Sequence, residues 1–239
     1  ENINVAMETA KQIWPNNRTT ASAGQNGIEL RIENRVMSAG PTVSDEVAHT
    51  LLCFGGVRGT YSALKAGGIP IDIAYGQSLD VHMHYMKARD NLFRASVGGL
   101  DAKFIGVRGE KSSAREFLLQ RLLPAAHLGL ERAGVKQETI VHYLDLIARK
   151  LEFRWESVPN LPPGWGSKVG FTGADLQLYV DFQLRCRGGE FASDLARGCE
   201  ITRMIYQAQE YDRIYAESHG RGCGVLGWFQ ESYLPSIRH

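Results

Sequence analysis

Four charged residues of alternating sign stand two positions apart in the stretch ELRIENRV: Glu29, Arg31, Glu33 and Arg35. In a β-strand, side chains two positions apart point to the same face, so a strand here would carry all four charges on one side. Carboxylates bind hard cations such as Mg²⁺, and guanidinium groups bind phosphate oxygens in bidentate fashion. Phosphoryl transfer from ATP needs both, because the charge on the phosphates must be neutralised. The stretch therefore predicts a metal and phosphate site, or alternatively the solvated face of an amphipathic strand whose charges pair across the sheet.

The segment before this strand predicts an antiparallel partner for it. Gly24 and the pair Asn26-Gly27 are strong turn signals. IWPNNRTT (residues 13–20) and IELRIENRV (residues 28–36) are thus expected to form a hairpin, or two strands of one antiparallel sheet. Such a sheet normally buries its apolar face under further strands or helices, so this one is expected to be incomplete.

Residues 44–217 are expected to be mostly helical. Ser44 can cap a first helix, whose second half is weakened by Gly55 and Gly56. A second helix is predicted over residues 79–97 from its apolar spacing.

A capping box of Ser113 and Glu116 predicts the start of a long helix that Gly134 can close. Pro124 is expected to kink this helix or divide it in two. Helical patterns then continue through residues 137–153 and through most of residues 173–217.

The organisation is therefore that of one α+β domain. Residues 1–43 supply strands of an antiparallel sheet, residues 44–217 form a large helical part that packs on it, and residues 218–239 form an irregular tail. Within the tail, the glycine-rich GRGCG (residues 220–224) could cradle an anion, but no strand–helix pattern frames it, which favours a flexible segment.

Composition excludes several classes of function. The 239 residues include 27 basic and 26 acidic ones, giving a net charge of +1, which argues against nucleic acid or an anionic membrane as a partner. No apolar run approaches the roughly 18 residues of a membrane span, and no leader pattern opens the chain. The four cysteines show no CxxC spacing, so a reducing, cytoplasmic location is expected.

Several motifs occur in a recognisable order between residue 10 and about residue 180. IWPNNR (13–18) precedes the strand, and Ile32-Glu33-Asn34-Arg35 leads into VMSAGPT. Asn91 and Arg94 precede the sequence GLDA, which ends at Ala102. A long helical stretch, the segment YLDLIARKL (143–151) and Thr172-Gly173-Ala174-Asp175 follow. In this order and spacing the chain resembles the C-terminal half of the type 2 glutamate–cysteine ligase-like family of ATP-dependent carboxylate–amine ligases.

The resemblance implies a catalytic sheet of the glutamine-synthetase/glutamate–cysteine-ligase type that binds ATP with Mg²⁺ or Mn²⁺. ATP would convert an amino-acid carboxylate into an acyl phosphate, which an amine then attacks. Matched by motif, Glu33 would bind the metal and Arg35 the ATP phosphates, and both would be catalytic. Glu29 would be a further metal ligand, and Arg31 and Arg18 further phosphate contacts.

The family's N-terminal half, which supplies other metal ligands and much of the substrate pocket, has no counterpart here. The chain is therefore expected to be one part of a longer protein or a subunit that needs a partner chain, and to form a homo-oligomer. The alternative function is a non-catalytic, family-derived subunit or assembly module.

Other residues that could take part in catalysis or metal binding also have structural interpretations. His82 and His84 would pair on a strand but diverge by about 200° on a helix. A cysteine nucleophile with His127 or His142 has no supporting motif, and buried structural cysteines are the commoner case. Trp155 and Trp165 lie in a loop rich in proline and glycine, where they could belong to a lid or anchor the loop to the core.

Overall fold

A computed structural model describes residues 17–24, 27–34, 40–66, 81–106, 109–186 and 194–237. In residues 17–24, 28–34, 63–66 and 81–86 the description covers the backbone alone. Two compact units divide the chain, one of residues 1–39 and one of residues 40–239. Each unit is described by itself.

The first unit contains the predicted hairpin. Strand β1 (Asn17–Gly24) runs antiparallel to β2 (Gly27–Asn34), and Gly24 pairs with Gly27 at the turn. Gly27 has a φ of 120°, a value that glycine adopts without strain. The predicted hairpin is thus confirmed, but β1 continues to Gly24, beyond the predicted end of the strand at residue 20.

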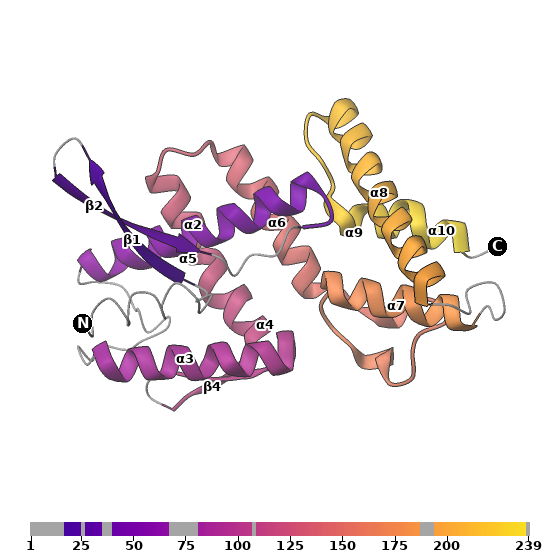
Figure 1. Cartoon of the computed structure of the whole chain (residues 1–239), viewed down its shortest axis with the longest axis horizontal. Coiled ribbons are helices and arrows are strands. Elements are labelled where there is room, and N and C mark those ends of the chain that lie inside the picture. The colour runs from indigo at the N-terminus through magenta and orange to yellow at the C-terminus, as the bar shows by residue number, and fades with distance from the viewer. Residues whose placement is uncertain are drawn as a thin grey trace, which may run out of the picture. The chain divides into compact units, whose positions relative to one another are not determined.

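The second unit is mostly helical, so the chain as described is an α+β protein with small antiparallel sheets (Figure 1). A second two-stranded sheet, β3 (Lys103–Ile105) with β4 (Lys111–Ser113), joins two of its helices. The α-helices are α2 (Val43–Ala66), α3 (Val81–Gly98), α4 (Ala114–Phe117), α5 (Leu123–Arg132), α6 (Gln137–Glu152), α7 (Gly173–Cys186), α8 (Asp194–His219), α9 (Gly224–Trp228) and α10 (Leu234–Ile237). Short turns of other helix types are η2 (Gly99–Asp101), η3 (Leu118–Leu122), η4 (Trp155–Ser157), η5 (Trp165–Ser167) and η6 (Phe229–Tyr233).

Local sequence signals set several of these boundaries. Ser113 and Glu116 form the predicted capping box at the start of α4. The helix passes through the π-helical turn η3 immediately before Pro124, because proline cannot supply the N–H that a regular turn needs there. Gly134, with a φ of 78°, ends the helical run as predicted.

Helices α2 and α5 pack backbone against backbone. A Cβ atom at Gly59 would overlap the carbonyl oxygen of Ala125, and one at Gly129 would overlap that of Gly55. The sequence interpretation that Gly55 weakens this helix is incomplete, because the same lack of a side chain permits the close crossing.

An aromatic cluster forms the core beneath the segment that connects α6 to α7. Trp155 is fully buried, stacks on Phe171 with ring centroids 5.6 Å apart, and donates from Nε1 to the carbonyl of Gly170 at 2.8 Å. Tyr179 and Phe229 bring α7 and the C-terminal helices into the same cluster. Trp155 therefore anchors this connection to the core, as one of the two sequence interpretations proposed.

The C-terminal segment differs from the sequence prediction of an irregular tail. Residues 224–237 are helical throughout, and Val225, Trp228 and Phe229 are buried. Residues 222–229 are buried on every side, so their sequence lacks the alternation of apolar and polar positions that marks an exposed helix.

Candidate functional site

The hairpin carries four of the five predicted site residues. Its register pairs Arg18 with Glu33, Thr20 with Arg31, and Ser22 with Glu29. Positions directly opposite in an antiparallel ladder belong to the same face, with Cβ atoms typically about 5 Å apart. Positions 18, 29, 31 and 33 thus share one face of the hairpin.

Arg35, the remaining predicted site residue, lies outside the described residues. Among the side chains that the structure describes, which do not include those of Glu29 and Glu33, no three or more His, Cys, Asp or Glu residues lie together as a metal site requires.

Two of the recognised motifs have structural roles. The amide of Asn91 on α3 donates to the carbonyl of Ile105 and accepts from its N–H, both at 3.0 Å, and so fixes β3 to the helix. Thr172 and Asp175 cap α7 reciprocally, each backbone N–H donating to the other side chain at 3.0 Å. Both motifs therefore have a structural role, because Asn91 holds β3 on α3 and Thr172 with Asp175 caps the start of α7.

The structure weakens two of the alternative catalytic interpretations. His82 and His84 lie on helix α3, where residues two positions apart diverge. Cys223 is buried, and burial together with the carboxylates of Asp212 and Glu231 raises the pKa of its thiol to about 12. A thiol with that pKa is protonated at neutral pH and cannot act as a nucleophile.

A cluster of buried charges, which no sequence pattern indicates, lies at the start of α2. Asp45, Lys150 and Asp212 are all at most 8% exposed. Lys150 of α6 forms an ion pair with Oδ1 of Asp45, whose Oδ2 accepts from the hydroxyl of Thr42 at 2.8 Å and from the N–H of Val225 at 2.9 Å. We call Asp45, Lys150 and Asp212 the buried charge cluster.

Asp212 of α8 completes the cluster through backbone donors. Its Oδ2 accepts from the N–H of Ser44 at 3.3 Å, and its Oδ1 accepts from the N–H of Gly224 at 2.8 Å. Both donors lie in the first turns of helices, where N–H groups lack intrahelical partners and favour negative charge. The two carboxylates thus cap α2 and α9 at once.

The cap of α2 is made by Thr42, not by the predicted Ser44. The hydroxyl of Thr42 accepts from the N–H of Asp45 at 3.2 Å, whereas Ser44 already stands inside the helix. The prediction failed because both residue types cap equally well and the sequence around them does not distinguish the two positions.

The prediction of a flexible GRGCG segment is wrong. A side chain at Gly222 would overlap the hydroxyl of Ser44 and the carboxylate of Asp212, and Gly224 adopts a φ of 70°. The segment does receive anions, as the weaker sequence interpretation suggested, but they are carboxylates of the protein itself. Its glycines permit the backbone to approach them.

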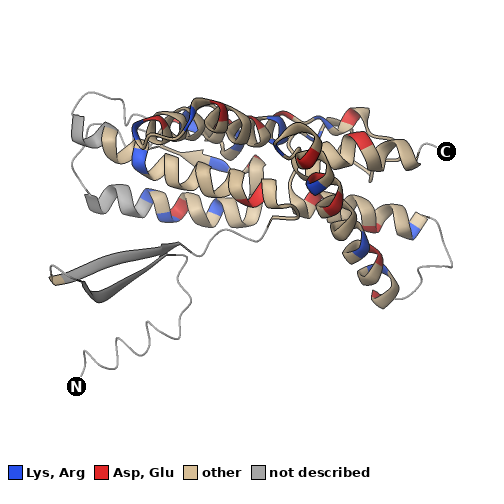
Figure 2. Cartoon of the chain, turned by 90° about the horizontal axis from the view of Figure 1, so that it is seen from above, with Lys and Arg blue, Asp and Glu red and all other residues tan. Residues whose placement is uncertain are grey.

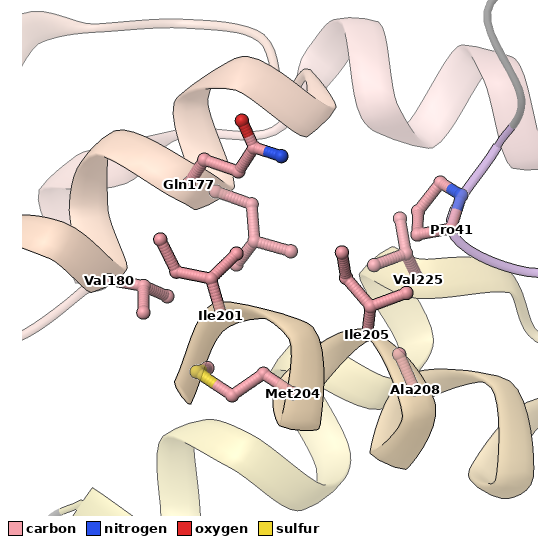
Figure 3. A pocket seen from close by; sticks show the side chains of 9 residues that line it. Pro41, Gln177, Val180, Ile201, Met204, Ile205, Ala208 and Val225 are labelled. Atoms are coloured by element: carbon pink, nitrogen blue, oxygen red, sulfur yellow. The ribbon is translucent and has the colours of Figure 1, made fainter. Parts of the chain in front are cut away.

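A small cavity lies between α7, α8 and α9 (Figure 3). Its volume is about 20 Å³, which is about the space of one water molecule. The lining is apolar apart from Gln177, so the cavity is a gap in packing and not a ligand site. The residues around it are Pro41, Leu176, Gln177, Val180, Ile201, Met204, Ile205, Ala208 and Val225.

Charges of both signs alternate along the surfaces of the helices (Figure 2). On α8, for example, Arg213 pairs with Glu210 and Glu217. Among the helices described, none combines the length and the hydropathy of a membrane-spanning segment.

Comparison with protein-family models, curated proteins and solved structures found no match to this chain.

Proposed function

We propose that this chain provides part of the active site of an ATP-dependent carboxylate–amine ligase, located on the charged face of the β1–β2 hairpin. The observation that carries the proposal is the register, which adds Arg18 to the face of Glu29, Arg31 and Glu33. A phosphate and metal site needs both carboxylate and guanidinium groups on one rigid surface, and a paired strand supplies that surface.

The proposed reaction has two steps. A carboxylate oxygen of the amino-acid substrate attacks the γ-phosphorus of ATP, ADP leaves, and an acyl phosphate forms. The nitrogen of the amine then attacks the acyl carbon, inorganic phosphate leaves, and the nitrogen loses a proton to give the amide.

Each proposed residue has a role in the first step. Glu33 and Glu29 would hold Mg²⁺ or Mn²⁺, which would neutralise charge on the phosphates, while Arg35, with Arg31 and Arg18, would bind the phosphate oxygens. Both interactions lower the repulsion between the incoming carboxylate and the triphosphate.

The test is the release of ADP and phosphate by the chain and by the complete product of its reading frame. Release should require an amino acid, an amine acceptor and a divalent metal, and Glu33→Gln should abolish it. Glu210→Gln, on the exposed surface of α8, is the matched control and should leave the rate unchanged. Full turnover by Glu33→Gln would overturn the assignment.

The exposed face of α2 favours a second candidate function, that of a non-catalytic subunit that assembles with a partner chain. Phe54, Val57 and Tyr61 are 72%, 68% and 62% exposed and stand three and four residues apart, so they form one stripe. The opposite face of α2 packs on α5 and α6, so the stripe lies on the solvent side of the helix, beside the exposed polar residues Thr50 and Arg58. Exposed apolar patches on a protein surface commonly mark contact sites for other proteins.

Two measurements separate the two functions. Calorimetry with Mg-ATP should show micromolar binding if the ligase proposal holds and none if the chain is only an assembly module. Sedimentation of Phe54→Asp tests the second function, because a charge in the stripe should dissociate any assembly formed through it. An unchanged sedimentation coefficient would argue against that interface.

A further inference from the structure

Helix α3 is held to the helical unit along one narrow face. From Lys87 to the end of the helix, where the side chains are described, no residue is buried. Ala88, Asn91 and Ala95 are half-buried and stand three and four positions apart, so they lie on one side of the helix. Asn91 exchanges two hydrogen bonds with Ile105 of β3, which shows that this side faces the small β3–β4 sheet.

The opposite side of α3 carries exposed apolar side chains. Successive residues of an α-helix are about 100° apart, so Phe93 points away from both Asn91 and Ala95, each two positions from it. Phe93 and Val97 are one turn apart and are 71% and 76% exposed. Adjacent exposed apolar side chains commonly mark a contact site for another molecule.

Basic side chains flank this apolar pair. Phe93 lines a surface hollow of about 510 Å³ together with Arg89, Asp90 and Arg94. Arg89 and Asp90 approach only to 3.9 Å, and both side chains are more than half exposed, so this ion pair is weak. Within the described part of the chain, Arg94 forms no ion pair. With Lys87, the described side chains of α3 carry three positive charges and one negative charge, whereas the whole chain is nearly balanced.

We propose that this face of α3, formed by Arg89, Phe93, Arg94 and Val97, binds an acidic segment of a partner protein. An apolar side chain of the segment lies on Phe93 and Val97, and its Asp or Glu carboxylates accept hydrogen bonds from the two guanidinium groups. Aromatic and arginine side chains are also the types most enriched in protein–protein contacts. The proposal does not depend on the ligase proposal, and it concerns a different helix from the apolar stripe of α2.

Asp90 favours a protein over the other anionic partners that arginine binds. Its carboxylate lines the same hollow as Phe93, Arg89 and Arg94. An anionic lipid surface or a nucleic acid presents phosphates at high density and repels such a carboxylate. A peptide, in contrast, can place a neutral or basic residue opposite Asp90 while its acidic residues contact the arginines.

A library of random peptides displayed on phage tests the proposal, with the purified chain as the target. The selected peptides should combine Asp or Glu with large apolar residues, and their binding should weaken as salt is added. Replacing the acids of a selected peptide by Asn and Gln should weaken its binding at least about tenfold. Selected peptides without acidic residues, or an amide version that binds equally well, would overturn the proposal.

Variants of the chain identify the surface. Phe93→Asp and Arg94→Glu should each weaken binding of the selected peptides at least about tenfold, because each removes one of the two kinds of contact. The matched controls Leu178→Asp, on α7, and Arg154→Glu should leave the affinity unchanged. All four positions are exposed, so the variants should remain folded. Peptides that bind Phe93→Asp as tightly as the wild-type chain would contradict the assignment to α3.

Vesicles of phosphatidylserine and phosphatidylcholine test the membrane as a rival partner. The wild-type chain should not sediment with them, because Asp90 lies among the basic side chains. Vesicle binding that Phe93→Asp abolishes would replace the partner protein by a lipid surface and so overturn the proposal.

Discussion

Glu29, Arg31 and Glu33 of β2 and the buried charge cluster contain the same kinds of side chain, but the first are two positions apart in the sequence and the second are brought together from distant positions. The charges of the strand alternate with apolar or uncharged residues, a pattern that is visible in the sequence alone. The cluster joins Asp45 to a lysine 105 positions away and Asp212 to Ser44 across 168 positions. Charges close in sequence on a strand face are inexpensive to keep in water, whereas charges brought together in the interior must be fully paired. A regular charge pattern in the sequence therefore does not identify the charged residues that stabilise the fold.

Removing the cation of the cluster should produce the largest effect. Lys150→Met leaves the Asp45 carboxylate buried without its ion pair, and breaking a buried pair from one side costs about 3–5 kcal/mol. Urea denaturation should show that loss in the free energy of unfolding. The control Arg213→Gln breaks only exposed pairs on α8 and should cost less than about 1 kcal/mol. Equal losses of unfolding free energy in the two variants would show that the buried ion pair contributes no more to stability than the exposed pairs.

Asp212→Asn should have an intermediate effect. The amide keeps the shape of the carboxylate but replaces one acceptor oxygen with a donor, so either Ser44 or Gly224 loses the acceptor for its N–H. A buried donor left unsatisfied costs about 1–3 kcal/mol. The same denaturation experiment measures it, and no loss of stability would show that the two helix ends do not need this residue.

A smaller effect, on the pH dependence of stability, is expected from His49, which lies one turn after Asp45 on α2. Burial, followed by the nearby Lys150, lowers its pKa below 6.5, while Asp45 partly opposes this shift. The unfolded chain then binds the proton more readily, so stability should be complete above pH 6.5 and should decline as the pH falls below it. His49→Gln should flatten that part of the stability profile. A profile of unchanged slope would show that His49 does not contribute.

The smallest effect on stability is expected on the charged strand. Arg31→Gln in β2 should change the free energy of unfolding by no more than about 0.5 kcal/mol, as is usual for a surface charge. If Arg31 contacts ATP, the same variant should weaken Mg-ATP binding measured by calorimetry. A large loss of stability would instead identify the strand as part of a core.

The elements with local signals were predicted from the sequence. The turn between the strands, the capping box at Ser113 and the break before Pro124 all depend on residues within a few positions of one another. The close crossing of α2 and α5 was not predicted, because Gly59 alone says nothing about which helix approaches it. The cluster and the C-terminal helices were missed for the same reason, since their partners are set by tertiary packing.

Of the candidate site, the sequence predicted two antiparallel strands around residues 13–20 and 28–36, but not the register that places Arg18 opposite Glu33. It could not predict that Asp45 and Asp212 would cap two helices, because a lone aspartate near a helix start is common. The assignment of Glu33 and Arg35 to ATP chemistry remains a prediction, to be decided by the turnover assay.

The contact between α2 and α5 has a mechanical consequence. Where backbones touch, no flexible side chains lie between them to absorb a displacement, and close-packed interiors transmit strain. Gly55, Gly59 and Gly129 should therefore make the two helices move as a single rigid body.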